Sequence, residues 1–136
     1  MAKRRDIRSI SFGKKSPPKY CNQSVEYNGI RFDSKKEAER FAYLSLLQRA
    51  GEITDLQRQV PFELIPTQRE SDSVGKRGGI KRGKCIEKSC VYYADFVYKD
   101  KGGNIVVEDA KGLKTEVYKI KKKLMLYRHH IRITEV

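Results

Sequence analysis

The residues of this chain best suited to chemistry are charged side chains placed within apolar strand-like sequences. Asp95 lies between Ala94 and Phe96 in a run rich in Val, Tyr and Phe, and Asp109 and Lys111 close a second run rich in Val and Ile. A carboxylate buried in a sheet is costly unless it is paired with a cation or binds a metal. These strand carboxylates are therefore the first candidates for a functional site.

Side chains alternate along a strand, so Asp109 and Lys111 share one face while Glu108 and Ala110 point to the other. An ion pair with Lys111 would satisfy one carboxylate, which is the purely structural alternative. Two carboxylates against one Lys still leave negative charge in a basic chain, and a divalent cation would balance it. Mg²⁺ binds through a few carboxylates together with water or phosphate oxygens, and we expect Mn²⁺ to substitute for it.

Phosphodiester hydrolysis is the reaction class that such a metal site favours. The metal would activate a bound water and stabilise charge on the phosphate. Lys111 would orient that water and help to neutralise the phosphate.

The charge balance indicates a polyanionic partner, with nucleic acid as the first choice. The chain has 136 residues, and 30 Lys and Arg against 17 Asp and Glu give a formal net charge of +13. Much of the excess lies in residues 1–20 and 111–132, each with a single acidic residue. An ordinary solvated surface explains a small excess better than one of this size. The residues expected to contact DNA are Lys3, Arg4, Arg5, Lys76, Arg77, Lys81, Arg82, Lys114, Lys119, Lys121, Lys122 and Lys123.

The length fits a single domain. We expect residues 1–19 to form a basic flexible arm and residues 20–136 to form the domain, with a long structureless basic loop at 67–90 that contacts the substrate. No run approaches the roughly 20 apolar residues of a membrane span, and the basic start precedes no signal-peptide core. A cytoplasmic location is expected.

Local patterns predict an α/β fold with a mixed sheet flanked by helices. A hairpin is expected around Asn28-Gly29, and the apolar stripes of the two helices are expected to face the core. The first helix is expected to be capped by Asp33 or Ser34, to run to Ala50 and to have Gly51 as its C-cap. The second helix is expected from Thr115 to His129. The expected strands are a hairpin at 24–32, a strand at 59–65, paired strands at 91–98 and 104–111, and a last strand at 131–136. The expected core-facing residues are Ala38, Phe41, Ala42, Leu44, Leu46 and Leu47 in the first helix and Val117, Ile120, Leu124 and Tyr127 in the second.

A strand Asp, a hairpin turn and then Asp-x-Lys resemble the PD-(D/E)XK nuclease superfamily, whose restriction-endonuclease-like αβββαβ core matches this element order. Four segments, at 32–39, 59–64, 93–96 and 107–112, are similar to a family of small phage-encoded proteins long catalogued as a domain of unknown function and assigned to that superfamily. The resemblance covers roughly residues 20–136.

The resemblance implies roles for individual residues. Asp95 and Asp109 match metal-binding carboxylates, Lys111 matches the catalytic lysine, and the Ala110 carbonyl falls where the superfamily often supplies a backbone metal ligand. One departure is that no Pro precedes Asp95. If the strand were bulged, Glu108 would replace Asp109 as the ligand.

Glu37 matches an acidic residue that many members place in the active site from the first helix. Its structural alternative is a capping box, since Ser34-x-x-Glu37 can bond the helix start. Glu39 and Gln59 are weaker candidates for the same site.

The resemblance implies a Mg²⁺-dependent DNA endonuclease, and a structure-selective enzyme such as a phage Holliday-junction resolvase is the leading expectation. The basic segments suit contacts to backbone phosphates, which carry no base information. Symmetric cutting of two strands would require a homodimer. The alternatives are a nicking or site-specific endonuclease and, in a different class, a non-catalytic DNA-binding accessory protein.

Overall fold

The structure is a computed structural model that describes residues 23–110 and 113–136. The predicted basic arm at 1–19, with Lys3, Arg4 and Arg5, lies outside the described residues, as does Lys111.

A four-stranded mixed sheet forms the centre of the molecule. It contains β3 (Thr54–Ile65), β8 (Cys90–Lys99), β9 (Ile105–Asp109) and β10 (Thr134–Glu135) in the order β10-β9-β8-β3. The β3–β8 and β8–β9 pairs are antiparallel and the β9–β10 pair is parallel. The predicted α/β class and the 91–98/104–111 hairpin are thus confirmed, although β3 begins five residues earlier than expected and β10 is shorter than the predicted 131–136.

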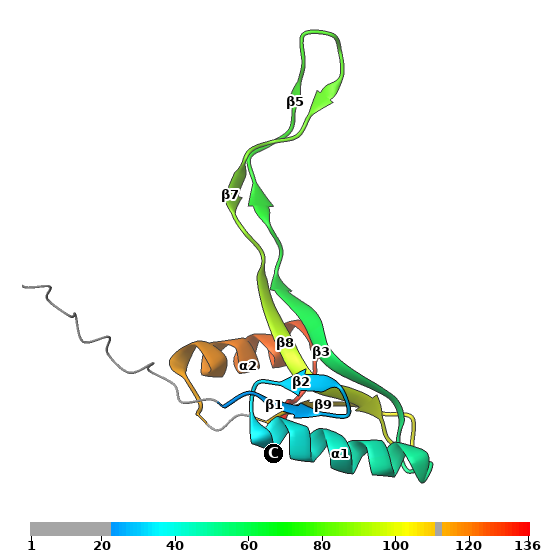
Figure 1. Cartoon of the computed structure of the whole chain (residues 1–136). Helices are drawn as coiled ribbons and strands as arrows, with labels where there is room; N and C mark the ends of the chain where they lie inside the picture. The colour runs from blue at the N-terminus through cyan, green and yellow to red at the C-terminus, as the bar shows by residue number, and fades with distance from the viewer. Residues whose placement is uncertain (1–22, 111–112) are drawn as a thin grey trace, which may run out of the picture.

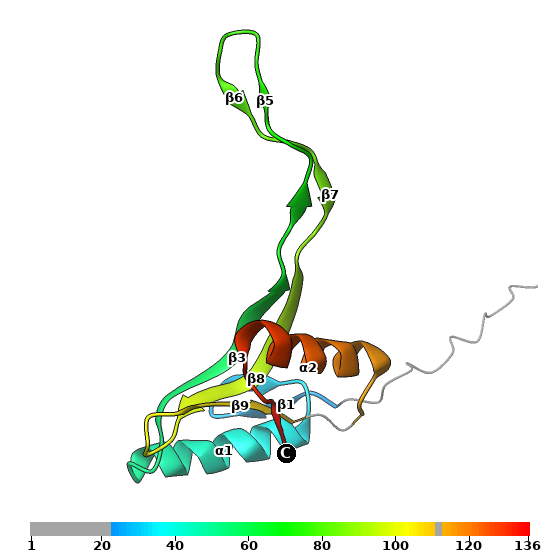
Figure 2. The same ribbon diagram turned by 180° about the vertical axis from the view of Figure 1, so that it is seen from behind.

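Two helices pack against the sheet, as Figures 1 and 2 show. The first, α1 (Lys35–Arg49), begins after Ser34, whose Oγ accepts a hydrogen bond from the Glu37 backbone N–H at 3.2 Å. It ends with Ala50 as C-cap, one residue before the predicted Gly51. The second, α2 (Glu116–His129), is capped by Thr115 in the same way, as predicted.

Each helix covers its own apolar cluster, and the two clusters lie against opposite faces of the sheet. In β9, Val106 packs with the cluster under α1 and the next residue, Val107, packs with the cluster under α2; Ala110, just after β9, packs under α1 again. The α2 cluster contains Leu64, Tyr92, Ala94, Val107, Tyr118, Met125 and Ile133. The α1 cluster contains Leu44, Ile53, Phe96, Tyr98 and Ala110.

The predicted core face of α2 is wrong for three of its four residues. Val117, Ile120 and Tyr127 are exposed, whereas Tyr118 and Met125 are buried. The sheet-facing side of the helix also carries Lys121 and Lys122, whose amino groups reach hydrogen-bond acceptors on neighbouring strands. Long Lys side chains can pack through their methylene groups although they end in a charge. A core-facing side of a helix that contains lysines therefore looks polar in the sequence. In α1 the corresponding error is Leu46, which is exposed.

A small hairpin of β1 (Val25–Tyr27) and β2 (Ile30–Phe32) packs beside α1. Asn28 and Gly29 both have positive φ, which is the turn geometry that an Asn-Gly pair favours. Phe32 is buried, and its ring lies 5.3 Å from that of Phe41 in α1. The predicted hairpin is therefore confirmed.

The predicted structureless loop at 67–90 is wrong. Beyond the sheet, β3 and β8 continue as a two-stranded ribbon that projects away from the helices (Figures 1 and 2). We name residues 66–89 the ribbon arm; β4 (Gln68–Arg69) pairs with β7 (Cys85–Glu87), and β5 (Ser73–Val74) pairs with β6 (Ile80–Lys81). The backbone hydrogen bonds of the ribbon arm form without burying either face of the ribbon. Its sequence therefore shows no alternation of apolar and polar residues.

In the part of the chain that the structure describes, no helix is both long and apolar enough to cross a membrane.

Candidate active site

Two buried aspartates meet where the β8–β9 ladder ends. Asp95 in β8 is 6% exposed and Asp109, the last residue of β9, is 0% exposed. The last backbone pair of the ladder is Phe96 with Glu108. Beyond it, the Asp95 carboxylate accepts a hydrogen bond from the Ala110 N–H at 2.8 Å. Asp95 is therefore tied to the backbone that directly follows Asp109.

Gln59 of β3 contacts the other oxygen of Asp95. Its Nε2 donates to Asp95 Oδ1 at 3.1 Å, so both carboxylate oxygens are hydrogen bonded. Gln59 has a φ of 49°, a left-handed conformation that is uncommon for a long side chain and is found at functional sites. The structure thus places this weaker sequence candidate directly on Asp95.

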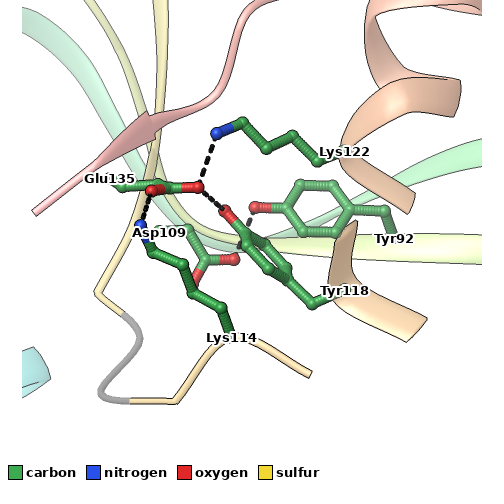
Figure 3. A network of polar contacts seen from close by, with 6 residues as sticks. All are labelled: Tyr92, Asp109, Lys114, Tyr118, Lys122 and Glu135. Atoms are coloured by element: carbon green, nitrogen blue, oxygen red, sulfur yellow. Dashed lines mark hydrogen bonds and ion pairs between the residues drawn. The ribbon is translucent and has the colours of Figure 1, made fainter. Parts of the chain in front are cut away.

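Tyr92 of β8 holds Asp109. Its hydroxyl donates to Asp109 Oδ2 at 2.7 Å, as Figure 3 shows. Burial and this hydrogen bond raise the pKa of Tyr92 well above its ordinary value, so the phenol stays protonated and remains a donor. Burial also raises the pKa of Tyr118, helped by the nearby charge of Asp109 and by a hydrogen bond to Glu135.

Glu135 of β10 lies beside Asp109 in the parallel strand pair. It accepts hydrogen bonds from Lys122 Nζ at 2.6 Å and from the Tyr118 hydroxyl at 3.1 Å, and it forms an ion pair with Lys114 (Figure 3). Hydrogen bonds from Lys114 and Lys122 lower its pKa to about 2. This carboxylate is therefore neutralised by lysines of its own chain.

Sequence reasoning missed Glu135, Tyr92 and Tyr118. The two tyrosines look like ordinary core residues in their strand and helix. Glu135 reaches the site only because β10 runs parallel to β9, and no local pattern specifies that pairing.

Glu108 points to the opposite face of the sheet from Asp109. Its carboxylate accepts two hydrogen bonds from Arg40 of α1, at 2.8 and 2.7 Å, and a third from the Tyr98 hydroxyl at 2.6 Å. The hydrogen bond to Glu108 raises the pKa of Arg40, and burial with the Glu108 contact raises that of Tyr98 to about 12. The β8–β9 pairing has no register shift up to Glu108, so the bulge that would exchange Glu108 for Asp109 is absent there.

Glu37 is half-buried in the first turn of α1. It precedes Arg40 by three residues, so the two side chains lie on the same side of the helix, the side on which Arg40 contacts β9. Its N–H bonds Ser34, which is one half of the predicted capping box. Glu39 is exposed and pairs with Lys35 at 3.6 Å, so Glu39 does not face the sheet.

In a comparison with known families, residues 17–135 match a family described as "Protein of unknown function (DUF1064)". The chain belongs to the DUF1064 family. No curated protein and no solved structure matches it. The matched residues include Asp95, Asp109 and the whole ribbon arm.

The lysines in and just before α2 that were expected to bind DNA are mostly engaged within this DUF1064 chain. Lys119 bonds Glu116 at 2.7 Å, and Lys121 donates to the Val91 carbonyl at 2.9 Å, while Lys114 and Lys122 bond Glu135. Lys123 is exposed. The predicted DNA-contacting residues of the ribbon arm, Lys76, Arg77, Lys81 and Arg82, are all exposed.

The donor atoms of the site are of the type that Mg²⁺ prefers. Asp95, Asp109 and the Ala110 carbonyl offer oxygen only, and Mg²⁺ is often bound by one or two carboxylates while it keeps several waters. Within the described residues, no group of three or more His, Cys, Asp and Glu is gathered around one point. Two carboxylates suit Mg²⁺, which takes few protein ligands, whereas a structural zinc site needs four side chains.

Proposed function

We propose that this DUF1064 protein is a metal-dependent endonuclease that hydrolyses DNA phosphodiester bonds. The observation that carries this proposal is the pair of buried aspartates, Asp95 and Asp109, where the β8–β9 ladder ends; Asp95 accepts a hydrogen bond from the N–H of Ala110, which follows Asp109. The order α1-β3-β8-β9-α2-β10 supports a restriction-endonuclease-like αβββαβ core.

The hydrogen bonds around the aspartates would fix their orientation for a metal. Gln59 and the Ala110 N–H hold Asp95, and Tyr92 holds Asp109 from the other side. A bound Mg²⁺ or Mn²⁺ would activate a water and stabilise charge on the phosphate. Lys111, two residues after Asp109, would place a positive charge near the phosphate.

The proposed substrate is branched DNA, as for a Holliday-junction resolvase. Among the described residues predicted to contact DNA, those of the ribbon arm and Lys123 are exposed and form no ion pair within the chain, and contacts from such residues to phosphates position the duplex without reading its bases. A homodimer would place two sites on two strands. Sedimentation with and without junction DNA tests this assembly.

One experiment tests the activity and its substrate together. The purified protein is incubated with labelled four-way junction, flap and linear duplex of the same arm sequences, with Mg²⁺ or with EDTA. Paired, Mg²⁺-dependent incisions at the junction are expected. Equal cutting of the plain duplex would favour the nicking or site-specific endonuclease.

The non-catalytic accessory protein is supported by a specific observation. Both oxygens of Asp95 have hydrogen-bond donors within the chain, and Asp109 is fully buried. A buried pair held by such contacts is compatible with a structural role. This alternative predicts salt-sensitive DNA binding with no cleavage in Mg²⁺ or Mn²⁺.

A further inference from the structure

The ribbon arm changes character along its length. Its outer part, residues 74–84, contains five basic residues and no acidic one, whereas Glu70, Asp72 and Glu87 lie nearer the body. Among the described residues, none of these five basic side chains forms an ion pair. The five residues are Lys76, Arg77, Lys81, Arg82 and Lys84. The far end of the arm therefore carries a concentrated positive charge that no acidic side chain of the described residues neutralises.

The tip also carries an exposed apolar pair. Val74 and Ile80 are directly opposite each other in the β5–β6 pair, so their side chains share one face of the ribbon. They are 78% and 83% exposed. Beyond them, the Gly78 N–H donates to the Gly75 carbonyl at 2.9 Å and closes a tight turn. The turn places Lys76 and Arg77 at the apex, next to the apolar pair.

The arm has a defined path between its two strand pairs. The Glu70 N–H donates to the Lys84 carbonyl at 2.9 Å, and the Gly83 N–H donates to Asp72 Oδ1 at 2.9 Å. A Cβ at Gly83 would lie 1.8 Å from the Glu70 carbonyl oxygen, so only glycine fits this close approach. Both views show the tip as the part of the arm farthest from α1 and α2 (Figures 1 and 2).

We propose that the tip of the ribbon arm is a DNA wedge, in which Val74 and Ile80 insert against unstacked bases while the neighbouring basic residues contact phosphates. Two-stranded ribbons can enter the minor groove of DNA, where apolar side chains inserted at base steps unstack and bend the duplex. A second copy of this chain is a poor occupant, because its net charge of +13 repels the basic tip.

The wedge would make the protein selective for branched DNA. This inference rests on the proposed function, because it takes DNA as the substrate. Insertion into a continuous duplex requires stacked bases to be separated. At a branch point the stacking is already interrupted, so the same insertion is less costly there. The tip would thereby favour junctions without reading a base sequence.

The test measures binding in EDTA, where cleavage is blocked. Wild type, Val74→Thr/Ile80→Thr and Lys76→Ala/Arg77→Ala are titrated against a four-way junction and against linear duplex, with 2-aminopurine at the branch point to report unstacking. Threonine keeps the β-branched shape that stabilises strands, so the ribbon should persist. Ile105→Thr is the matched control, because Ile105 is also an exposed strand isoleucine, 59% exposed, but lies on the body.

The wild type and Ile105→Thr are expected to brighten 2-aminopurine and to prefer the junction. In the double Thr variant, the fluorescence rise should disappear and the preference for the junction over duplex should fall about tenfold, while its affinity for duplex stays within about twofold. Lys76→Ala/Arg77→Ala should weaken binding to junction and to duplex alike. Unchanged preference and fluorescence in the double Thr variant would overturn the wedge. A changed sedimentation mass in that variant with unchanged DNA selectivity would overturn it in favour of a protein contact.

The experiments distinguish a failure of the proposed wedge from a failure of the proposed nuclease. Unstacking that depends on Val74 and Ile80, in a protein that never cleaves, would support the wedge and reject the proposed nuclease. Metal-dependent cleavage with intact junction preference in the double Thr variant would do the reverse. If the wild type bound neither DNA, both would be rejected.

Discussion

Glu108 and Asp109 are neighbours in β9, yet their carboxylates are held from opposite sides of the sheet, Glu108 by Arg40 of α1 and Asp109 by Tyr92 of β8. Two adjacent acidic residues therefore have different surroundings. The first is paired with a cation, and the second is held by a neutral phenol beside a second aspartate. We expect substitutions at the two positions to separate stability from activity.

Glu108→Ala should destabilise the fold strongly. It leaves the Arg40 guanidinium and the Tyr98 hydroxyl without their carboxylate, and breaking a buried pair costs about 3–5 kcal/mol; we expect about 3 kcal/mol, because Arg40 is partly exposed. Urea unfolding measures the loss. Glu63→Ala is the control, since Glu63 is half exposed and lies 3.8 Å from Arg128. Equal stability of the two variants would show that the Arg40 pair is not structural.

Tyr92→Phe removes only the hydroxyl that donates to Asp109. A buried carboxylate that loses a donor costs about 1–3 kcal/mol, and the same change should slow cleavage because Asp109 is less well oriented. Tyr93→Phe is matched in chemistry, but Tyr93 is 56% exposed and should be neutral. Thermal unfolding and cleavage rates would be compared for both variants. If Tyr92→Phe behaved like Tyr93→Phe, the Tyr92 hydroxyl would have no role in holding Asp109.

The positive φ of Gln59 predicts an inverted preference between glycine and alanine. In an ordinary strand position glycine is less stable than alanine, but a left-handed conformation costs a non-glycine residue about 1–2 kcal/mol. Gln59→Gly should therefore be more stable than Gln59→Ala by about 1 kcal/mol. Both lose the hydrogen bond to Asp95 and should cleave slowly. A more stable alanine variant would argue against the strained backbone.

Glu135 should make stability depend on acid pH. Hydrogen bonds from Lys114 and Lys122 lower its pKa in the folded state from its ordinary value to about 2. A depressed carboxylate pKa stabilises the fold above the unfolded pKa, and this contribution disappears as the pH falls from about 5 to about 2. The melting-temperature difference between wild type and Glu135→Gln should shrink across that range. A difference that stayed constant would contradict the pairing.

Local turn and capping chemistry was predictable from the sequence, whereas features set by tertiary pairing were not. Asn28-Gly29, Ser34 and Thr115 act on the backbone next to them, so their hairpin and helix starts were predicted correctly. The buried face of α2 was wrong because lysines share it with Tyr118 and Met125.

The same limit applies to the candidate site. Asp95 and Asp109 could be identified because a carboxylate inside an apolar strand is conspicuous in the sequence. The contact from Gln59 accompanies a left-handed backbone conformation, and the position of Glu135 depends on a parallel strand pair; neither leaves a local pattern in the sequence. The ribbon arm was missed because its strands bury no face.

The most direct test of the proposed nuclease is the cleavage rate of Asp109→Asn in Mg²⁺ on junction DNA. Asparagine keeps the shape of the side chain and an acceptor for Tyr92, but it removes the charge that would bind the metal. Cleavage should fall by about three orders of magnitude or more while binding in EDTA stays within about threefold, because only the interactions of the reacting state are lost. Glu39→Gln, at an exposed carboxylate, should cleave like wild type. Wild-type cleavage by Asp109→Asn would contradict the assignment of the site.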